Sequence, residues 1–304
     1  MIKPNIKEMM EQLTITRETL LEGGYYEEET DFKVKSTDTL LEDVKKYYKE
    51  EVGSGFSLGF QKTDSDYNFL VRKGEVTILT GSSGSGKTTF LSQVLLNVMN
   101  YTNVLVASME MKPVLQIAKM IQQTGLKNPT EQGIEEFCEK YKDKLWLFNA
   151  QGTTTETDLV ASFSYGKYVL DCEVFVVDSL MKVDSIAEDD YASQKKFINK
   201  LTTIARDLNI HIFLVAHTKK LADDTVIPDA SHILGSSHIR NLTDNILCLH
   251  RRKDIEQQIQ LKELEVGDNT CTCYLMVQKQ RNHPFEGTFG FWFDKTTQRF
   301  KEQP

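Results

Sequence analysis

The sequence lacks the features of membrane-spanning and secreted proteins. Its apolar runs are all shorter than the roughly 20 residues that a helix needs to cross a bilayer, and residues 1–8 contain no apolar core of a signal peptide. The five cysteines are an odd number and are scattered, with Cys271 and Cys273 as the one close pair, so they indicate reduced thiols rather than disulfides or a metal site. We expect a protein of the cytoplasm (the host cytoplasm if a phage encodes it) or of an organelle matrix, without a membrane partner.

An excess of positive charge is also absent. The formal net charge is −8, whereas a protein that coats duplex DNA with its outer surface is usually basic. Any contact with nucleic acid must therefore come from a local basic strip, or from a pore to which each subunit contributes few residues. Internal repeats and low-complexity segments are absent too, and the length allows one large domain or one domain with an appendage.

The most informative segment that is present is a glycine-rich loop of the form G-x-x-x-x-G-K-[ST]. An apolar, β-branched run (75–80) precedes it and a helical run (89–99) follows. In this context the motif binds phosphate, because backbone N–H groups and the helix dipole face the ligand. Lys87 is expected to reach the β- and γ-phosphates, and the Thr88 hydroxyl to ligate Mg²⁺. The residues expected around ATP, or another NTP or dNTP, are Gly81, Ser82, Ser83, Gly84, Ser85, Gly86, Lys87, Thr88 and Thr89.

Strand-like and helical segments alternate from residue 56 onward. The strand candidates are 104–108, 145–148, 174–178 and 210–216. The helix candidates are 114–123 and 193–209. Continuous apolar strands that alternate with helices predict an α/β domain with a doubly wound, mainly parallel sheet and helices on both faces. Beyond residue 245 the pattern changes to β-hairpins, with strand-like runs at 245–250, 272–278 and 289–293.

The first 55 residues differ from the rest. Residues 1–36 are polar and acidic, and we interpret them as an extension that can bind a partner. Residues 39–52 predict a helix with one apolar stripe, followed by a flexible glycine-rich joint. This helix can pack on its own domain or dock on a neighbouring subunit, and the pattern does not distinguish the two. The expected organisation is an extension (1–36), a helical linker (37–55) and a nucleotide-binding domain (56–304).

Polar residues at strand ends complete a candidate catalytic site. Asp178 ends one apolar strand, where a carboxylate faces the ligand crevice of a parallel sheet and can hold Mg²⁺. Glu110 lies just past another strand and is the candidate base that orients and deprotonates the attacking water; the alternative is a surface glutamate. His217 follows a third strand and can contact the γ-phosphate, or it can be structural.

Two cations follow the strand-like run 272–278. Lys279 and Arg281 are too far from the glycine-rich loop in sequence for their spacing to assign them to the phosphates. They indicate either an arginine finger that enters the site of a neighbouring subunit and stabilises transition-state charge, or a solvated basic turn.

Taken in order, these motifs resemble those of the hexameric replicative DNA helicases of RecA-like fold, the DnaB-like group, and the phage and mitochondrial (Twinkle-like) primase–helicase branch looks nearest. The resemblance covers about residues 39–300 and rests on the loop 81–88, Ser108-Met109-Glu110-Met111, Val215-Ala216-His217, the segment 235–244 and Lys279-Gln280-Arg281-Asn282. It implies that Glu110 is the catalytic glutamate, that His217 senses the γ-phosphate, and that Arg281 is the trans-acting finger assisted by Lys279. It also implies that Arg251 and Phe293 contact the nucleotide base.

The same resemblance implies that the helix 39–52 packs on the adjacent subunit and that residues 219–237 form a loop that grips single-stranded DNA. A second candidate pore loop is 182–191. The candidate DNA-binding residues are Lys219, Lys220, Ser236, Ser237, His238 and Arg240. Three features depart from the family pattern. Leu234 occupies a position where relatives often carry a basic or bulky residue, and three aspartates make the stretch 220–234 less basic. We also expect no primase or zinc-binding module before residue 39.

The sequence therefore predicts an ATP-driven motor that forms a homo-oligomeric ring, expected to be a hexamer, and moves along single-stranded DNA during replication, with a separate primase or polymerase as an expected partner. Two alternatives stay open. One is a strand-exchange recombinase of the same fold, which forms filaments. The other is a scaffold or loader that binds ATP without acting as a motor.

Overall fold

The chain divides into two units, residues 1–53 and 54–304. The computed structural model describes residues 36–51, 54–126, 128–149, 152–184, 186, 190–218, 227–229, 232, 237–267 and 270–304. None of the helices within these ranges has the length and apolar character needed to cross a membrane.

In the first unit, the helix expected over 39–52 is found between Leu41 and Glu51. It has α-helical geometry in α3 (Leu41–Lys46) and continues as a π-helical turn, η2 (Tyr47–Glu51). No residue of α3 is buried, and the apolar stripe is open to solvent, with Tyr48 73% exposed. Within the described part of this unit, the helix therefore has apolar side chains that none of its neighbours covers.

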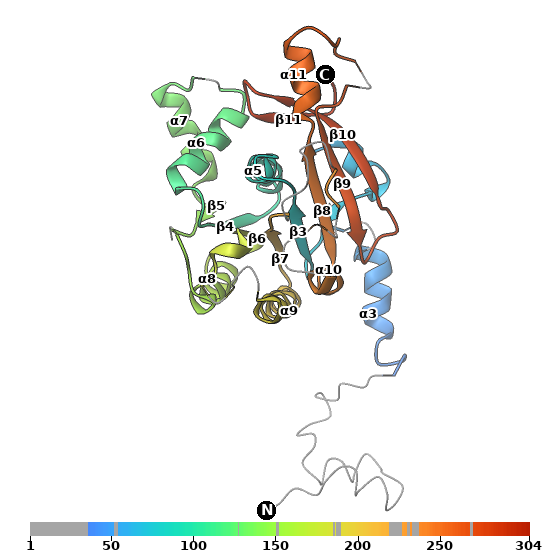
Figure 1. Cartoon of the computed structure of the whole chain (residues 1–304). Helices are drawn as coiled ribbons and strands as arrows, with labels where there is room; N and C mark the ends of the chain where they lie inside the picture. The colour runs from blue at the N-terminus through green and yellow to red at the C-terminus, as the bar shows by residue number, and fades with distance from the viewer. Residues whose placement is uncertain are drawn as a thin grey trace, which may run out of the picture. The chain divides into compact units, whose positions relative to one another are not determined.

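The second unit is built around a nine-stranded sheet (Figure 1). Its strands are β3 (Val76–Thr80), β4 (Asn103–Ser108), β5 (Leu145–Leu147), β6 (Cys172–Asp178), β7 (His211–Val215), β8 (Asn245–Arg251), β9 (Cys273–Gln280), β10 (Gly287–Asp294) and β11 (Arg299–Lys301). They lie in the order β11-β10-β9-β8-β3-β7-β6-β4-β5. Every pair from β8 to β5 is parallel, and β9, β10 and β11 extend the sheet with antiparallel pairs. The expected parallel sheet with C-terminal hairpins is confirmed.

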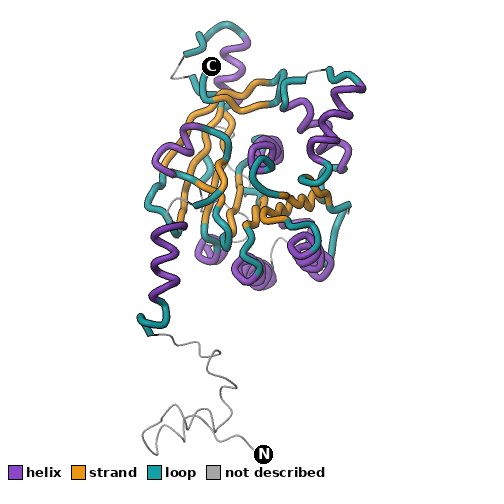
Figure 2. The backbone as a smooth tube through the Cα atoms, turned by 180° about the vertical axis from the view of Figure 1, so that it is seen from behind, coloured by secondary structure: helices purple, strands orange, loops and turns teal. Residues whose placement is uncertain are grey.

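Helices cover both faces of this sheet, as Figure 2 shows from behind. On one face lie α5 (Lys87–Val98), α6 (Pro113–Gln123) and α7 (Glu131–Tyr141) (Figure 1). On the other lie α8 (Glu156–Tyr168), α9 (Tyr191–Asp207) and α10 (Ser237–Leu242). The side chains of the central strand alternate between the two cores: Leu79 packs with Phe90 of α5, and Ile78 belongs to the core that contains Leu201 of α9. Burial on both sides explains why β3 is an unbroken apolar run.

Smaller elements complete the second unit. A two-stranded sheet pairs β1 (Phe56–Ser57) with β2 (Leu70–Val71), and between them lie α4 (Gln61–Asp64) and the short 3₁₀ helix η3 (Ser65–Tyr67). Another 3₁₀ helix, η4 (Leu180–Lys182), follows β6, and α11 (Lys253–Gln260) follows β8. None of the five cysteines, all of them within the described residues, forms a disulfide bond.

The direction of each strand decides which end of the sheet its terminal residues occupy. The carboxyl ends of β3, β4, β6 and β7 meet at one edge, because these strands are parallel. Strand β9 runs the other way, and its last residue, Gln280, pairs with Asn245, which pairs with Thr77 near the start of β3. Arg281 therefore leaves the sheet at the edge opposite to the glycine-rich loop.

Candidate active site

The glycine-rich loop joins β3 to α5 and has a backbone that requires glycine. Gly81 has a φ of +149°, and a Cβ atom there would lie 2.2 Å from the carbonyl oxygen of Leu249. Gly86, with a φ of +93°, caps α5 in the left-handed region. Lys87 follows in the first turn of α5, and its Nζ donates to the carbonyl oxygens of Gly81 (2.9 Å) and Ser82 (3.1 Å). Carbonyl oxygens of the loop thus hold the ammonium group next to the place where we expect the phosphates to bind.

Burial lowers the pKa of Lys87, and the negative charges of Asp178 and Glu110 oppose this effect. These opposing effects on the pKa are expected where one cation and two carboxylates lie together in a partly buried site. A lysine in such a place interacts more strongly with an anion than a solvated lysine does.

Thr88 and Asp178 come from different elements and touch. The Thr88 hydroxyl, in the first turn of α5, donates to Asp178 Oδ2 at the end of β6 across 2.8 Å. Asp178 is 2% exposed, and burial raises the pKa of its carboxyl group. Within the described residues, its other oxygen, Oδ1, is buried and accepts no hydrogen bond. A hydroxyl and a carboxylate with an unused oxygen, beside a phosphate loop, are a donor set that fits Mg²⁺.

Glu110 is held by two neighbours at the same edge of the sheet. Its Oε1 accepts a hydrogen bond from the Ser179 hydroxyl at 2.7 Å and lies 3.3 Å from His217 Nε2. The hydrogen bond from His217 is the largest cause that lowers the pKa of Glu110 to about 2, and Ser179 adds to it. Glu110 is therefore ionised at neutral pH. Sequence reasoning placed Glu110, Asp178 and His217 at three strand ends, and the fold brings them together.

These side chains line a cavity of about 470 Å³. Its walls include many of the residues expected around the nucleotide, namely Ser83, Gly84, Gly86, Lys87, Thr88, Thr89, Glu110, Asp178, His217, Arg251 and Phe293. Gly81, Ser82 and Ser85 do not line it; the first two contribute carbonyl oxygens to Lys87, and Ser85 is buried. Sequence reasoning missed four further lining residues, Met111, Lys119, Lys295 and Gln298. Three of them lie in helices and turns that carry no motif.

One wall of the cavity is a stack of a guanidinium group on an aromatic ring. Arg251 Cζ lies 4.0 Å from the ring centroid of Phe293. Glu256 of α11 accepts hydrogen bonds from both Nε and Nη2 of Arg251, the latter at 2.9 Å, and also pairs with Lys295 at 3.3 Å. The bidentate pair fixes the plane of the guanidinium group. A flat cationic and aromatic surface of this kind suits the face of a nucleobase.

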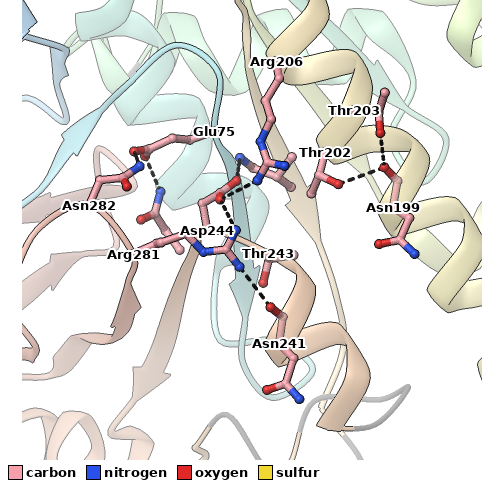
Figure 3. Close-up of polar contacts among 12 residues, drawn as sticks. Glu75, Asn199, Thr202, Thr203, Arg206, Asn241, Thr243, Asp244, Arg281 and Asn282 are labelled. Atoms are coloured by element: carbon pink, nitrogen blue, oxygen red, sulfur yellow. Dashed lines mark hydrogen bonds and ion pairs between the residues drawn. The ribbon is translucent and has the colours of Figure 1, made fainter. Parts of the chain in front are cut away.

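Lys279 and Arg281 lie outside this cavity. The Lys279 ammonium donates to the carbonyl oxygens of Arg240 (2.7 Å) and Thr243 (2.6 Å), at the C-terminal end of α10. Arg281 pairs with Asp244 at 3.1 Å and donates to the Asn241 carbonyl oxygen at 3.0 Å (Figure 3). Both cations therefore contact the end of α10 and the residues between α10 and β8, not the phosphate loop of the same chain.

The candidate DNA-binding residues are only partly within the described residues. Lys219, Lys220 and Ser236 lie outside them, as do residues 185 and 187–189 of the candidate loop 182–191. Ser237 and His238 lie in α10, but the structure describes only their backbone and not their side chains. Arg240, in the last turn of α10, is exposed.

The fold and the loop that carries Lys87 and Thr88, opposite the carboxylate of Asp178, define a P-loop nucleoside triphosphatase. Residues 55–302 match the family described as the DnaB-like helicase C terminal domain, and the chain belongs to this family. The RecA-like fold expected from the sequence is thereby confirmed.

Two curated relatives are similar to this chain. The Twinkle homolog protein, chloroplastic/mitochondrial, of Arabidopsis thaliana is 25% identical over 292 residues, which cover 87% of this chain and 39% of the relative. The DNA helicase/primase of Enterobacteria phage T3 is 26% identical over 247 residues, covering 72% of this chain and 43% of the relative. The chain thus spans about two-fifths of the length of these two relatives.

Solved structures share the fold. A DnaB-like replicative helicase, whose structure was described together with its interactions with primase, superposes with a TM-score of 0.67 at 17% identity, over 97% of this chain and 74% of that one. A separately solved ATPase domain gives a TM-score of 0.71 at 18% identity, over 88% of this chain and 99% of the domain. At these identities the likeness concerns the fold.

Proposed function

We propose that this chain is the motor of an ATP-dependent replicative DNA helicase that assembles as a ring, expected to be a hexamer, and translocates on single-stranded DNA. The observation that carries the proposal is the distance of Arg281 from the phosphate loop of its own chain. The phosphate loop, Glu110 and Asp178 lie at the carboxyl edge of the sheet, and Arg281 lies at the amino edge. Strand β3 alone has five residues, which separates the edges by about 13 Å at 3.3 Å per residue.

This separation means that Arg281 cannot complete the site of its own chain. A second copy in a head-to-tail arrangement can present its amino edge to the carboxyl edge of the first, and such heterologous contacts form rings when the rotation closes. Arg281 is 41% exposed, so it is accessible to a neighbour. A cation that reaches the γ-phosphate across the interface stabilises transition-state charge.

The residues of one chain then have separate tasks. Lys87 binds the β- and γ-phosphates, and Thr88 and Asp178 hold Mg²⁺, which when bound neutralises phosphate charge. Both contacts of Glu110 within the described residues are made by Oε1, so Oε2 remains to orient the attacking water and receive its proton. His217 lies next to Glu110 and on the wall of the cavity, which supports our proposal that it reports the γ-phosphate to the segment that follows β7.

We assign the DNA-gripping role to residues 219–237, with His238 and Arg240 next to them, which follow β7 and His217 closely in the chain. Contacts with the phosphate backbone are independent of sequence and weaken with salt. We further propose that α3 and η2, with their exposed apolar stripe, dock on the neighbouring subunit, and that a separate primase or polymerase is a partner.

Mixing of inactive subunits tests the shared site. The Lys87→Ala and Arg281→Ala variants are each expected to lose DNA-stimulated ATP hydrolysis. Mixed in equal amounts before assembly, they form interfaces that combine an intact loop with an intact finger, roughly a quarter of the total in a random head-to-tail ring, and activity returns. Arg299→Ala, at an exposed arginine of β11, is the matched control and keeps wild-type turnover.

Two outcomes favour the alternatives. Turnover that ignores single-stranded DNA and survives the loss of Arg281 indicates a scaffold or loader that binds ATP. Open filaments on DNA, in place of closed rings in negative-stain images, indicate a recombinase.

A further inference from the structure

Asp244 is a buried carboxylate that is tied to the strand of the phosphate loop. It lies between α10 and β8 and is 2% exposed. Its Oδ2 accepts the backbone N–H of Val76 at 3.0 Å, and its own N–H donates to the Val76 carbonyl oxygen at 3.2 Å. Val76 is the first residue of β3. The position of this carboxylate is therefore fixed by the sheet.

The other oxygen of Asp244 is shared by two arginines from distant parts of the chain (Figure 3). Arg281 Nη1 lies 3.1 Å from Oδ1, and Arg206 Nη2, from the last turn of α9, lies 3.3 Å from the same atom. The side chains of Arg281 and Arg206 are 41% and 54% exposed, whereas that of Asp244 is 3% exposed. One buried negative charge is thus held between two solvent-accessible positive charges.

Two guanidinium groups on one carboxylate oxygen carry one positive charge more than the carboxylate itself neutralises. The two guanidinium groups repel each other, which weakens the hold of each on Asp244. A buried carboxylate that loses its one cation is left as an uncompensated charge, which is strongly unfavourable. A carboxylate with two cations can lose one without that penalty. The pair therefore makes Arg281 easier to detach than a simple ion pair at this burial.

We propose that Arg206 is a positioning residue that keeps Asp244 neutralised while Arg281 leaves it to reach the terminal phosphate of a nucleoside triphosphate bound to the neighbouring subunit. This inference rests on the shared site of the proposed function. In the single chain Arg281 is held by Asp244 and the Asn241 carbonyl oxygen. In the assembly the phosphate competes for Arg281, and Arg206 remains with Asp244.

The simplest alternative is that Arg206 forms a surface ion pair of little consequence, because more than half of its side chain is in solvent. The two cases differ in what the loss of Arg206 does to turnover. Without Arg206, the departure of Arg281 leaves Asp244 unpaired. The finger is then retained in its own chain, and the catalytic step slows although nucleotide binding at the phosphate loop is unchanged.

Steady-state ATP hydrolysis on saturating single-stranded DNA tests this. We expect Arg206→Ala to lower kcat roughly tenfold, a barrier change of the size of one ion pair, with KM within about twofold of wild type. Arg206→Lys, which keeps a cation, retains most of kcat. Lys196→Ala, which removes a charge from an exposed position of the same helix, is the matched control and behaves as wild type.

A second substitution separates this role from a structural one. In the Arg206→Ala background, Asp244→Asn removes the charge that retains Arg281, so kcat is expected to recover. Wild-type kcat in Arg206→Ala overturns the proposal, and so does a loss of kcat that Asp244→Asn leaves unrepaired in a protein that still folds. If thermal unfolding shows that the double variant does not fold, the Lys/Ala contrast decides: equal losses in Arg206→Lys and Arg206→Ala overturn it.

Arg281→Ala, measured in parallel, separates this inference from the proposed function. Wild-type ATP turnover in Arg281→Ala contradicts the shared active site, and it overturns the role of Arg206 as well. An inactive Arg281→Ala combined with a fully active Arg206→Ala removes the role of Arg206 alone.

Discussion

The Thr88 hydroxyl donates a hydrogen bond to Asp178 Oδ2 across 2.8 Å. This contact joins the first turn of the helix behind the phosphate loop to the carboxyl end of β6, two strands away from β3 in the sheet. It brings together the two residues that the sequence assigned to a metal ion. It also leaves a buried carboxylate in a place where charge is unfavourable without a ligand.

Asp178→Asn is therefore expected to stabilise the nucleotide-free chain while abolishing hydrolysis. Because burial raises the pKa of Asp178, the folded chain binds this proton more tightly than the unfolded chain, whose value is near 3.8. Its charge thus lowers the free energy of unfolding as the pH rises above that value. At pH 7 we expect a gain of about 0.5–2 kcal/mol, the usual range for a stabilising substitution.

Chemical denaturation at two pH values measures this effect. The difference between Asp178→Asn and wild type should be largest at neutral pH and should disappear below the ordinary aspartate pKa, where both side chains are neutral. A variant that is less stable than wild type at pH 7 contradicts the assignment of Asp178 as a buried, unfavourable charge.

Glu110→Gln is expected to lower kcat by about 10²–10⁴, the usual contribution of a general base, and to leave ATP binding intact. The amide keeps the shape of the side chain and its contact with Ser179, but it cannot take a proton. Equilibrium binding of ATP and single-turnover hydrolysis, measured on the same preparation, test both halves. Glu135→Gln, on the exposed face of α7, is a control with the same chemical change.

His217→Ala is expected to make the chain less sensitive to acid. The pKa of Glu110 is lowered from 4.5 to about 2, first by the hydrogen bond from His217. A lowered carboxyl pKa contributes stability above the unfolded value, which is lost as the pH falls from about 4.5 towards 2. In His217→Ala this loss should be smaller, although Ser179 still contributes. Unfolding midpoints at pH 5 and pH 3 measure it, and an unchanged difference between them contradicts the assignment.

Glu256→Gln is expected to raise the KM for ATP roughly 3–10-fold, which corresponds to the value of one aromatic or cation–π contact. The substitution removes the carboxylate that fixes Arg251 over Phe293. Inorganic tripolyphosphate has no base, so its inhibition constant should not change. Asp254→Asn, at an exposed position of the same helix, is the control. An equal loss of affinity for tripolyphosphate shows that Glu256 supports the phosphate loop instead.

Lys279→Met distinguishes two roles for this lysine. In this chain its ammonium group donates to the carbonyl oxygens of Arg240 and Thr243, and a cation at a helix C-terminus typically contributes about 0.3–2 kcal/mol. If the contact is structural, the variant loses stability of this size and α10 exchanges its amide hydrogens faster. If Lys279 assists the finger in trans, as the family resemblance implies, kcat falls while exchange in α10 is unchanged. Lys279→Arg should preserve the structural contact.

The sequence predicted the structure best at positions where a single physical requirement explains the residue type. The unbroken run of β3 requires cover on both faces, and the glycines of the loop require backbone conformations that other residues avoid. Asp178 and His217 follow apolar runs, so the parallel arrangement alone placed them at one edge. The hairpins after residue 245 were likewise predicted from strand-like runs.

The elements that the sequence did not reveal have weaker local signals. Helices α7 and α8 were not anticipated, although Thr130 and Thr155 cap them by accepting the N–H groups of Gly133 and Asp158. The sequence Thr155-Glu156-Thr157-Asp158 is a start signal for a helix that could have indicated α8. The contacts of Lys279 and Arg206 had no such signal, because they depend on how β9 returns beside β8 and how α9 crosses the sheet.

If Arg281 serves the site of a neighbouring subunit, as we propose, the opposite positions of the phosphate loop and Arg281 give each subunit one end that supplies the arginine and one end that receives it. An open assembly of n subunits then contains n − 1 complete catalytic sites. The subunit at one end has a nucleotide site without an arginine finger, and the subunit at the other end has an arginine finger that reaches no site. Closing the assembly converts this leftover pair into one more site without adding a subunit. ATP turnover per subunit is therefore expected to be lowest in short open assemblies and highest in the closed ring. The rate of ATP hydrolysis then reports whether the ring is closed.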